Sequence, residues 1–347
     1  MVAQMESVSA PPATTRTLLD AIGQTPLVEL PRLFPGPVRV YAKLEYYNPT
    51  GSIKDRIARH MIRQAETSGR LKPGGTIVEG TSGNTGAALA AIAAAKGYHA
   101  ILAMPDKVST EKRDAARAYG AEVVVCPASP PDSAQHYMQK ARAIADSIPG
   151  AVFIDQYNNA LNVEAHYLTT GPEIWEQTQG NIDYFVASAS TGGTVSGAGK
   201  YLKQRKKDVH VLMPDPVGSV YECYFRTGKI DPAVRRPYQV EGIGKDMLAG
   251  CIDFHVIDEV MKLSDKDAFD AATRLAEQEG ILGGGSAGAN ICGCMALARR
   301  IHTPKVIVTV IPDSGLKYLS KFYNADWLAS AEYTRRETEG SRALLAG

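Results

Sequence analysis

One lysine of the chain stands where it could act as a nucleophile. Lys54 belongs to the sequence NPTGSIKDR of residues 48–56, in which a Pro-Thr-Gly turn follows an apolar run and opens a helical pattern. Most lysines are solvated surface charges, but removal from water near a helix N-terminus lowers the pKa of a lysine. The neutral amine can then form a Schiff base and carry protons. Lys54 is therefore the candidate catalytic residue.

Three glycine-rich segments could bind anions. We name residues 79–86 (EGTSGNTG) the carboxylate loop and residues 190–194 (STGGT) the phosphate loop, after the anion that each is predicted to bind, and the third segment is GGGSAG at residues 283–288. Each is predicted to follow a strand and open a helix, where backbone N–H groups and the helix dipole favour negative charge. One such loop alone could be an ordinary helix cap. Three in one chain favour a site for two anions.

The third segment also matches the G-x-G-x-x-G pattern of dinucleotide-binding folds. We disfavour a nicotinamide site, because only a short strand, 280–282, is expected before it and the next strand ends in Pro-Asp rather than in a ribose-binding acid. An amine, a phosphate loop and a carboxylate loop are the parts that pyridoxal 5′-phosphate needs to act on an amino acid. A nicotinamide-dependent oxidoreductase and a non-catalytic binding or scaffold protein are the alternatives from other functional classes.

The elements that must position these loops alternate along the chain. Apolar, β-rich runs are separated by helical patterns from about residue 38 to 320, which predicts an α/β, doubly wound fold with helices on both faces of a parallel sheet. Ligands of such folds bind outside the carboxyl ends of the strands. The expected strands are 38–44, 76–78, 100–104, 122–125, 153–154, 184–187, 210–213 and 306–311, and the expected helices include 54–68, 85–96, 110–119 and 134–147.

Composition excludes several classes of protein. The 347 residues are 44% apolar and 22% charged, so disorder over most of the chain is excluded. A net charge of +1 gives no overall attraction to nucleic acid or anionic lipid. The Ala-rich stretch 86–95 is much shorter than the ~20 residues that cross a bilayer. We therefore expect no nucleic-acid partner and no membrane partner.

The cysteines indicate a cytoplasmic protein with reduced thiols. Five cysteines form no C-x-x-C pair, and residues 1–16 lack the apolar core of a secretory signal. Cys292 and Cys294 lie two positions apart in an expected helix and so do not face each other. His302 is the only imidazole near them, so no metal site is expected.

Taken together, these segments resemble a known enzyme family. The residues 48–56, 81–86, 191–194 and 284–288 occur in the order and spacing of the fold type II pyridoxal-phosphate enzymes, the cysteine synthase and cystathionine β-synthase superfamily. The resemblance covers about residues 17–330. It implies two doubly wound, mostly parallel sheets flanked by helices, as in the tryptophan synthase β-like fold, with pyridoxal 5′-phosphate as the cofactor.

Two further segments are similar to the catalytic core of the cystathionine β-synthase branch. They are VEGIG at residues 240–244 and the run from Pro312 to Trp327. The resemblance implies a large cofactor-binding domain and a smaller, mobile domain that binds the substrate carboxylate. The expected ranges are a flexible tail 1–16, the large domain 17–47 with 151–330, the smaller domain 48–150, and a C-terminal tail 331–347.

The resemblance also assigns roles to single residues. Lys54 would form the Schiff base and remove the substrate Cα proton, and Asn84 would hydrogen-bond the cofactor's 3′-oxygen. Ser286 would face the pyridine nitrogen, and because a hydroxyl cannot protonate that nitrogen as a carboxylate can, loss of a β-substituent is favoured over transamination. The phosphate residues would be Ser190, Thr191, Gly192, Gly193 and Thr194. The substrate-carboxylate residues would be Thr81, Ser82, Gly83, Thr85 and Gln156, closed over by Gly242, Ile243 and Gly244.

The implied activity is β-replacement on L-serine or an O-activated L-serine through an α-aminoacrylate, a lyase or transferase reaction of transsulfuration and amino-acid biosynthesis. The leading interpretation adds homocysteine to give L-cystathionine. Two alternatives stay open: cysteine synthesis from O-acetyl- or O-phosphoserine and sulfide, and replacement by an amine to give a diaminopropionate precursor. Family analogy predicts a homodimer.

The chain also departs from the family pattern. Ser190 stands where these families usually have Gly, and Lys245 stands where many cystathionine β-synthases have an aromatic residue. The extra lysine suits an acidic second substrate or an anionic leaving group. No Cys or His precedes His60, so we expect no haem, and the 20 residues after Trp327 are too few for sensor repeats, so we expect no response to S-adenosylmethionine.

Overall fold

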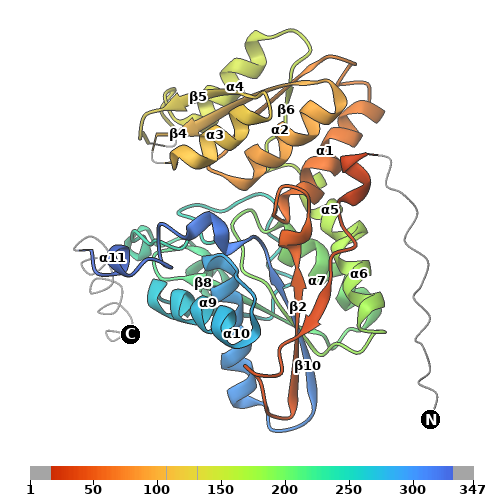
Figure 1. The fold of residues 1–347 in the computed structure, drawn as a ribbon, viewed down its shortest axis with the longest axis vertical. Coiled ribbons are helices and arrows are strands. Elements are labelled where there is room, and N and C mark those ends of the chain that lie inside the picture. Colours follow the sequence, from red (N-terminus) through yellow and green to blue (C-terminus); the bar gives the residue numbers. More distant parts are fainter. Residues whose placement is uncertain (1–16, 107, 131, 331–347) are drawn as a thin grey trace, which may run out of the picture.

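The structure, a computed structural model, describes residues 17–106, 108–130 and 132–330. Two units, each built around a sheet with helices packed on it, lie one above the other (Figure 1). The predicted tails 1–16 and 331–347 lie outside the described residues. The predicted fold class, α/β with mostly parallel sheets flanked by helices, is confirmed.

The smaller unit is a four-stranded parallel sheet in the order β5-β4-β3-β6. Neighbouring residues of one strand face opposite sides: Ile77 belongs to an apolar cluster with residues of α1, α2 and α3, whereas Val78 belongs to a cluster with residues of α4. The strands are β3 (Thr76–Gly80), β4 (His99–Pro105), β5 (Glu122–Cys126) and β6 (Val152–Phe153). The helices are α1 (Lys54–Thr67), α2 (Asn84–Lys96), α3 (Thr110–Ala118) and α4 (Tyr137–Ser147).

The larger unit is a six-stranded sheet in the order β1-β2-β10-β7-β8-β9, parallel except for the pair β1 and β2. Its central strand β10 is an almost uninterrupted apolar run, as expected for a strand with both faces covered. The strands are β1 (Leu27–Glu29), β2 (Val38–Leu44), β7 (Tyr184–Val186), β8 (His210–Pro216), β9 (Glu259–Leu263) and β10 (Lys305–Ile311).

Helices cover both faces of the larger sheet. Phe185 packs against α6 and α7, and its neighbour Val186 packs against α9 and α10 on the opposite face. The helices are α5 (Leu161–Leu168), α6 (Thr170–Gln177), α7 (Gly193–Arg205), α8 (Tyr221–Thr227), α9 (Asp265–Glu279), α10 (Gly285–Arg300) and α11 (Ala325–Leu328). Short 3-10 helices are η1 (Leu18–Ala21), η2 (Glu45–Tyr47), η3 (Pro232–Val234) and η4 (Gly315–Tyr318).

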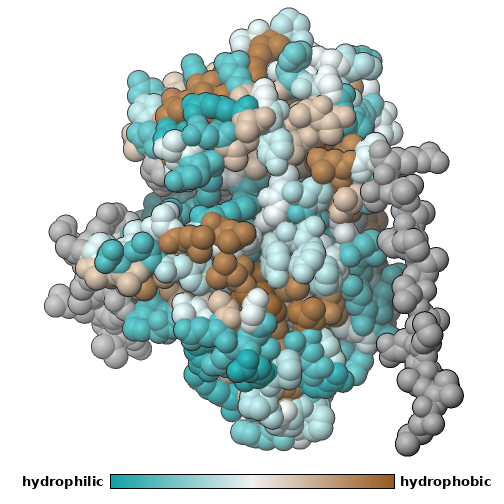
Figure 2. All heavy atoms as spheres, in the orientation of Figure 1, coloured by the Kyte–Doolittle hydropathy of each residue, from teal (hydrophilic) through white to brown (hydrophobic). Residues whose placement is uncertain are grey.

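The sequence prediction was wrong at one strand and missed two. Residues 280–282 form no strand, and the third glycine-rich segment is reached from the helix α9, so it is not a strand-to-helix loop. β1 and β9 were not predicted, because β1 has only three residues and β9, with the sequence EVMKL, is not a continuous apolar run. No helix in the described part of the chain is long and apolar enough to cross a bilayer. Figure 2 shows hydrophilic residues over much of the visible face and a hydrophobic patch on the larger unit.

A buried charge network fixes the helix that carries Lys54. Arg56, two residues along α1, donates two hydrogen bonds of 2.6 and 2.7 Å to Glu45 and two of 2.6 and 2.7 Å to Glu173. Lys43 Nζ lies 2.7 Å from Glu173. The network therefore sets two cations against two anions, which is the condition under which charges are tolerated in a protein interior. It joins β2, η2, α1 and α6.

Replacement of Glu173 by Gln tests this network. The variant leaves two buried cations with one anion, so we expect the free energy of unfolding at pH 7, measured by urea denaturation, to fall by about 3–5 kcal/mol. The matched control is Glu29→Gln, which removes the exposed partner of Arg39 and should change stability by about 1 kcal/mol or less. Equal losses in the two variants would show that burial of the network does not matter.

The stabilisation that the Glu173 carboxylate provides should also depend on pH. Burial acts to raise the pKa of Glu173, but the hydrogen bonds and charges of Arg56 and Lys43 outweigh it and hold the pKa at about 2. Because this value is below that of the unfolded chain, the stabilisation is complete above about pH 4.5 and is lost as the pH falls through about 2. The stability difference between the natural protein and Glu173→Gln should shrink over that range.

Candidate active site

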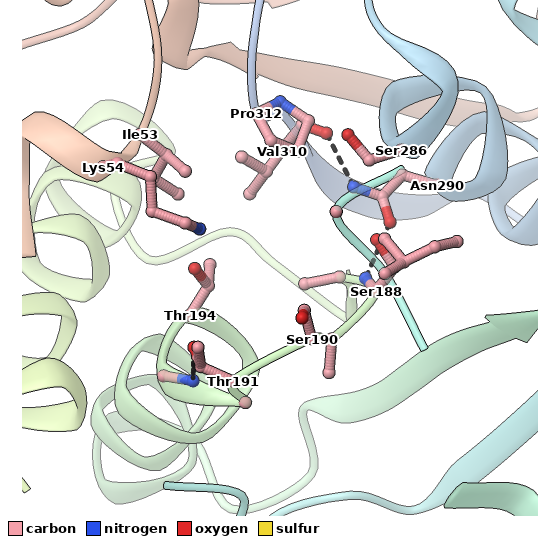
Figure 3. Close-up of a pocket in the computed structure, with 16 residues that line it drawn as sticks. Ile53, Lys54, Ser188, Ser190, Thr191, Thr194, Ser286, Asn290, Val310 and Pro312 are labelled. Carbon is pink, nitrogen blue, oxygen red and sulfur yellow. Dashed lines mark hydrogen bonds between the residues drawn. The ribbon is translucent and has the colours of Figure 1, made fainter. Parts of the chain in front are cut away.

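A pocket lies at the carboxyl ends of β7 and β10, where ligands of open α/β sheets bind (Figure 3). It contains about 420 Å³ of empty space, solvent at its mouth included, which is within the range of small-molecule sites. None of the described residues that line it is a carboxylate. Of the predicted residues, the lining includes Lys54, Ser190, Thr191, Gly192, Gly193, Thr194, Gly242, Ile243 and Ser286.

Lys54 enters the pocket from the first residue of α1, and its amine points into the open space (Figure 3). Burial lowers the pKa of Lys54, and the negative charges of Asp313 and Glu45 oppose that effect. Within the described ranges, its Nζ has no hydrogen-bond or ion-pair partner. An amine that is desolvated and unpaired is available for attack on a carbonyl carbon.

The phosphate loop connects β7 to α7 and can be formed only with glycines. Gly192 has a φ of +88°, and a Cβ there would lie 2.5 Å from Ile252. At Gly193 a Cβ would lie 1.8 Å from Asn162 Oδ1. The Gly193 N–H donates 3.4 Å to Thr191 Oγ1, and the start of α7 lines the pocket, which is where helices in other proteins bind anions. The side chains on the same side of the pocket are Ser190, Thr191 and Thr194 (Figure 3).

Two residues that the sequence analysis missed hold the hydroxyls of this loop. His166 Nε2 lies 3.2 Å from Thr194 Oγ1, and its Nδ1 lies 2.9 Å from Thr170 Oγ1. Burial lowers the pKa of His166 well below its usual value, and the charge of Lys54 adds to this effect, so the imidazole is neutral. Asn162 Nδ2 donates 3.0 Å to Thr191 Oγ1. Polar residues on the buried side of α5 were the signal that could have identified both.

Ser286 faces Lys54 across the pocket, at the start of α10 (Figure 3). Asn290, one turn further along α10, accepts from the Ser188 N–H (2.7 Å) and donates to the Val310 carbonyl (2.8 Å). Helix α10 is thereby fixed to the ends of β7 and β10. The pocket thus has an anion site on one side, a hydroxyl on another, and an amine facing both.

The carboxylate loop lies beside the pocket rather than in its lining. Thr85 Oγ1 donates 2.7 Å to Gln156 Oε1, so two of the predicted substrate-carboxylate residues are in contact. Asn84 Nδ2 donates 2.8 Å to Asp313, the residue after the lining residue Pro312. Gly244 donates its N–H to the Ala189 carbonyl of the pocket wall. The predicted residues outside the lining are Thr81, Ser82, Gly83, Asn84, Thr85, Gln156 and Gly244.

Comparisons with known proteins give matches over most of the chain. Residues 18–313 match the family model described as "Pyridoxal-phosphate dependent enzyme". The cystathionine β-synthase of Apis mellifera is 42% identical over 320 residues, which are 90% of this chain and 62% of that protein. The chain therefore spans less than two thirds of the length of that curated relative.

Two solved structures are similar over nearly their whole length. A crystal structure of O-ureido-L-serine synthase has a TM-score of 0.83 and 36% identity, covering 92% of this chain and 100% of that one. The O-acetylserine-dependent cystathionine β-synthase from Helicobacter pylori has a TM-score of 0.81 and 34% identity, covering 89% of this chain and 98% of that one.

Substitution of Gly193 tests the phosphate loop. In Gly193→Ala the loop must move away from Asn162, so we expect pyridoxal 5′-phosphate to bind the apoprotein about tenfold more weakly or worse, measured by titration of the visible absorption. The matched control is Gly36→Ala, because nothing lies within 4 Å of a Cβ at Gly36. If both variants bind as tightly as the natural protein, the loop does not hold the cofactor.

Proposed function

The chain belongs to the family of pyridoxal-phosphate dependent enzymes, and from this we propose that it catalyses β-replacement on L-serine or an O-activated L-serine, with homocysteine as the nucleophile and L-cystathionine as the product. The observation that carries the proposal is the unpaired Lys54 amine between an anion loop and Ser286 in one pocket. The names of the similar proteins support this class of reaction.

The residues of the pocket fit the cofactor. The phosphate loop offers N–H groups and hydroxyls where a Cβ at Gly192 or Gly193 would collide with neighbouring segments, and no carboxylate of the described lining opposes an anion. Lys54 would hold the aldehyde carbon, and Ser286 would contact the ring nitrogen. When bound, the cofactor supplies an electron sink that weakens the substrate's Cα–H bond.

Lys54 acts as the base of the reaction. With a substrate amino acid in the site, Lys54 Nζ would be placed to take the Cα proton, and general-base catalysis of this kind contributes about 10²–10⁴-fold to the rate. Burial favours the neutral amine before the transfer, since it lowers the pKa of Lys54. The nearby charge of Asp313 stabilises the ammonium that forms.

Lys245 bears on the choice of the second substrate. Its Nζ lies 4.4 Å from the ring centroid of Tyr157, the residue after Gln156, and it forms no ion pair with any described residue. Glu79, a buried carboxyl whose charge would act on Tyr157, is not a counter-ion at pH 7, because burial raises the pKa of Glu79 to about 8. A cation that lies on an aromatic face and has no anionic partner favours a substrate that carries an anionic group. Homocysteine carries a carboxylate, and sulfide does not.

A panel of substrates tests the reaction. The purified protein with pyridoxal 5′-phosphate is incubated with L-serine, O-acetyl-L-serine or O-phospho-L-serine, each combined with homocysteine, sulfide or glutamate, and the products are identified by mass spectrometry. We expect cystathionine from homocysteine and none from the Lys54→Ala control. Product from sulfide alone would favour cysteine synthesis, and product from glutamate alone would favour the amine-nucleophile alternative.

The variant Lys245→Met tests whether Lys245 binds the carboxylate of the nucleophile or an anionic leaving group. If Lys245 binds the carboxylate of the nucleophile, the KM for homocysteine rises about tenfold while the KM for sulfide is unchanged. If it binds the leaving group, only the KM for O-phosphoserine rises. We expect the first result, and the exposed Lys207→Met is the matched control. Unchanged constants for every substrate would exclude Lys245 from the site.

The smaller domain over the pocket, the cytoplasmic location and the homodimer stay predictions, and a single observation supports each of them. Lys112 on α3 pairs with Glu241, the neighbour of Gly242, which supports a role for residues 48–150 in covering the pocket. All five cysteines are free, which supports a cytoplasmic location. The hydrophobic patch on the larger unit (Figure 2) supports a homodimer, because such patches are common at subunit interfaces.

A further inference from the structure

Two side chains from the end of the larger sheet contact Asn84, the first residue of α2 in the smaller unit, and a third contacts one of them. Lys317 Nζ donates 2.8 Å to Asn84 Oδ1, and Asn84 Nδ2 donates 2.8 Å to Asp313 Oδ2. Tyr318 donates its hydroxyl to the same carboxylate oxygen, also at 2.8 Å. Asp313 and Lys317 follow β10 directly, although they are more than 200 residues from Asn84 along the chain.

These partners determine which way the Asn84 amide points. An ammonium group has only donors, so the atom that faces Lys317 must be the amide oxygen. A carboxylate has only acceptors, so the atom that faces Asp313 must be the amide nitrogen. Rotation of the amide by 180° would set N–H groups against the ammonium and the oxygen against the carboxylate. Lys317 and Asp313 therefore both disfavour the rotated amide.

One N–H group of the Asn84 side chain has no partner among the described residues. The amide nitrogen carries two N–H groups, and among the described residues only Asp313 accepts from it. The amide oxygen is already occupied by Lys317. Toward an anionic oxygen, which can only accept, Asn84 thus offers a single hydrogen-bond donor.

The network also lies beside the reactive lysine. Lys317 Nζ donates to the carbonyls of Thr50 (3.2 Å) and Gly51 (3.3 Å), shortly before Lys54 in the chain. The Ile53 N–H donates 2.8 Å to the carbonyl of Pro312. Asp313 is only 2% exposed, and its second oxygen has no partner among the described residues. Movement of Lys317 would therefore be transmitted to both Asn84 and the loop before Lys54.

We propose that Lys317 and Asp313 are positioning residues that hold Asn84 as an obligatory hydrogen-bond donor toward an anionic oxygen on the ring of the cofactor. The inference rests on the proposed function, in which Asn84 contacts the 3′-oxygen. A donor stabilises negative charge on that oxygen, whereas a rotated amide would present its own oxygen and repel the charge. Lys317 and Asp313 do not touch the reacting atoms and act through Asn84.

The test measures cofactor binding and the spectrum of the bound cofactor in the absence of substrates. In Lys317→Met the amide loses one of its two orienting partners and is held by Asp313 alone, so we expect about tenfold weaker binding of pyridoxal 5′-phosphate and a shifted pH dependence of its visible absorption. Lys317→Arg should restore both, because a guanidinium also has only donors. The matched control, the exposed Lys207→Met, should change neither.

A double-variant cycle separates positioning from a general structural role. Asn84→Ala should show the same losses as Lys317→Met, and the two substitutions together should be no worse than Asn84→Ala alone, because Lys317 acts through Asn84. Additive losses, or a lowered melting temperature of Lys317→Met with an unchanged spectrum, would overturn the inference. An unchanged spectrum in Asn84→Ala would instead refute the contact with the 3′-oxygen, and the positioning role with it. None of these results depends on which nucleophile the enzyme uses.

Discussion

The position of the Lys54 amine depends on a charge that is buried two residues away. The Arg56 guanidinium is removed from water, and four hydrogen bonds to Glu45 and Glu173 compensate for the loss. Such a network is weak evidence for a gain in stability, because desolvation offsets much of the attraction. It nevertheless allows only one placement of α1, since any shift would leave a charge unpaired. Lys54 is thereby held in one place.

The pocket differs from this network because its charge is not balanced by groups of the protein. Around Arg56 every charge is balanced within the protein, whereas the described lining of the pocket has one amine and no carboxylate. His166, behind Thr194, is kept neutral, because burial and the charge of Lys54 both lower its pKa. An anionic ligand is therefore met by N–H groups, hydroxyls and the Lys54 amine. The imbalance that would be costly in the core is what makes the site a binding site.

The end of β10 is where the separate segments meet. Pro312 accepts the N–H of Ile53, and Asp313 accepts that of Gly284 through its carbonyl and the Asn84 amide through its side chain. β10 can do this because it is the strand between β2 and β7 in the larger sheet. Parallel neighbours end at the same edge, so the loops that follow them converge there. The lysine, the third glycine-rich segment and α2 are all tied to this one edge.

The sequence by itself determined the α/β class and most of the strands, and it singled out Lys54 and the phosphate loop as candidates for the site. Each of these has a local cause: periodicity, turn-forming residues, or glycines at the start of a helix. The tertiary structure alone decided that β1 and β9 complete the larger sheet and that residues 280–282 form no strand. It also decided that His166 holds Thr194 and that Lys317 orients Asn84 from 233 residues away. These contacts arise from the order of strands in a sheet, and no pattern in neighbouring residues records that order.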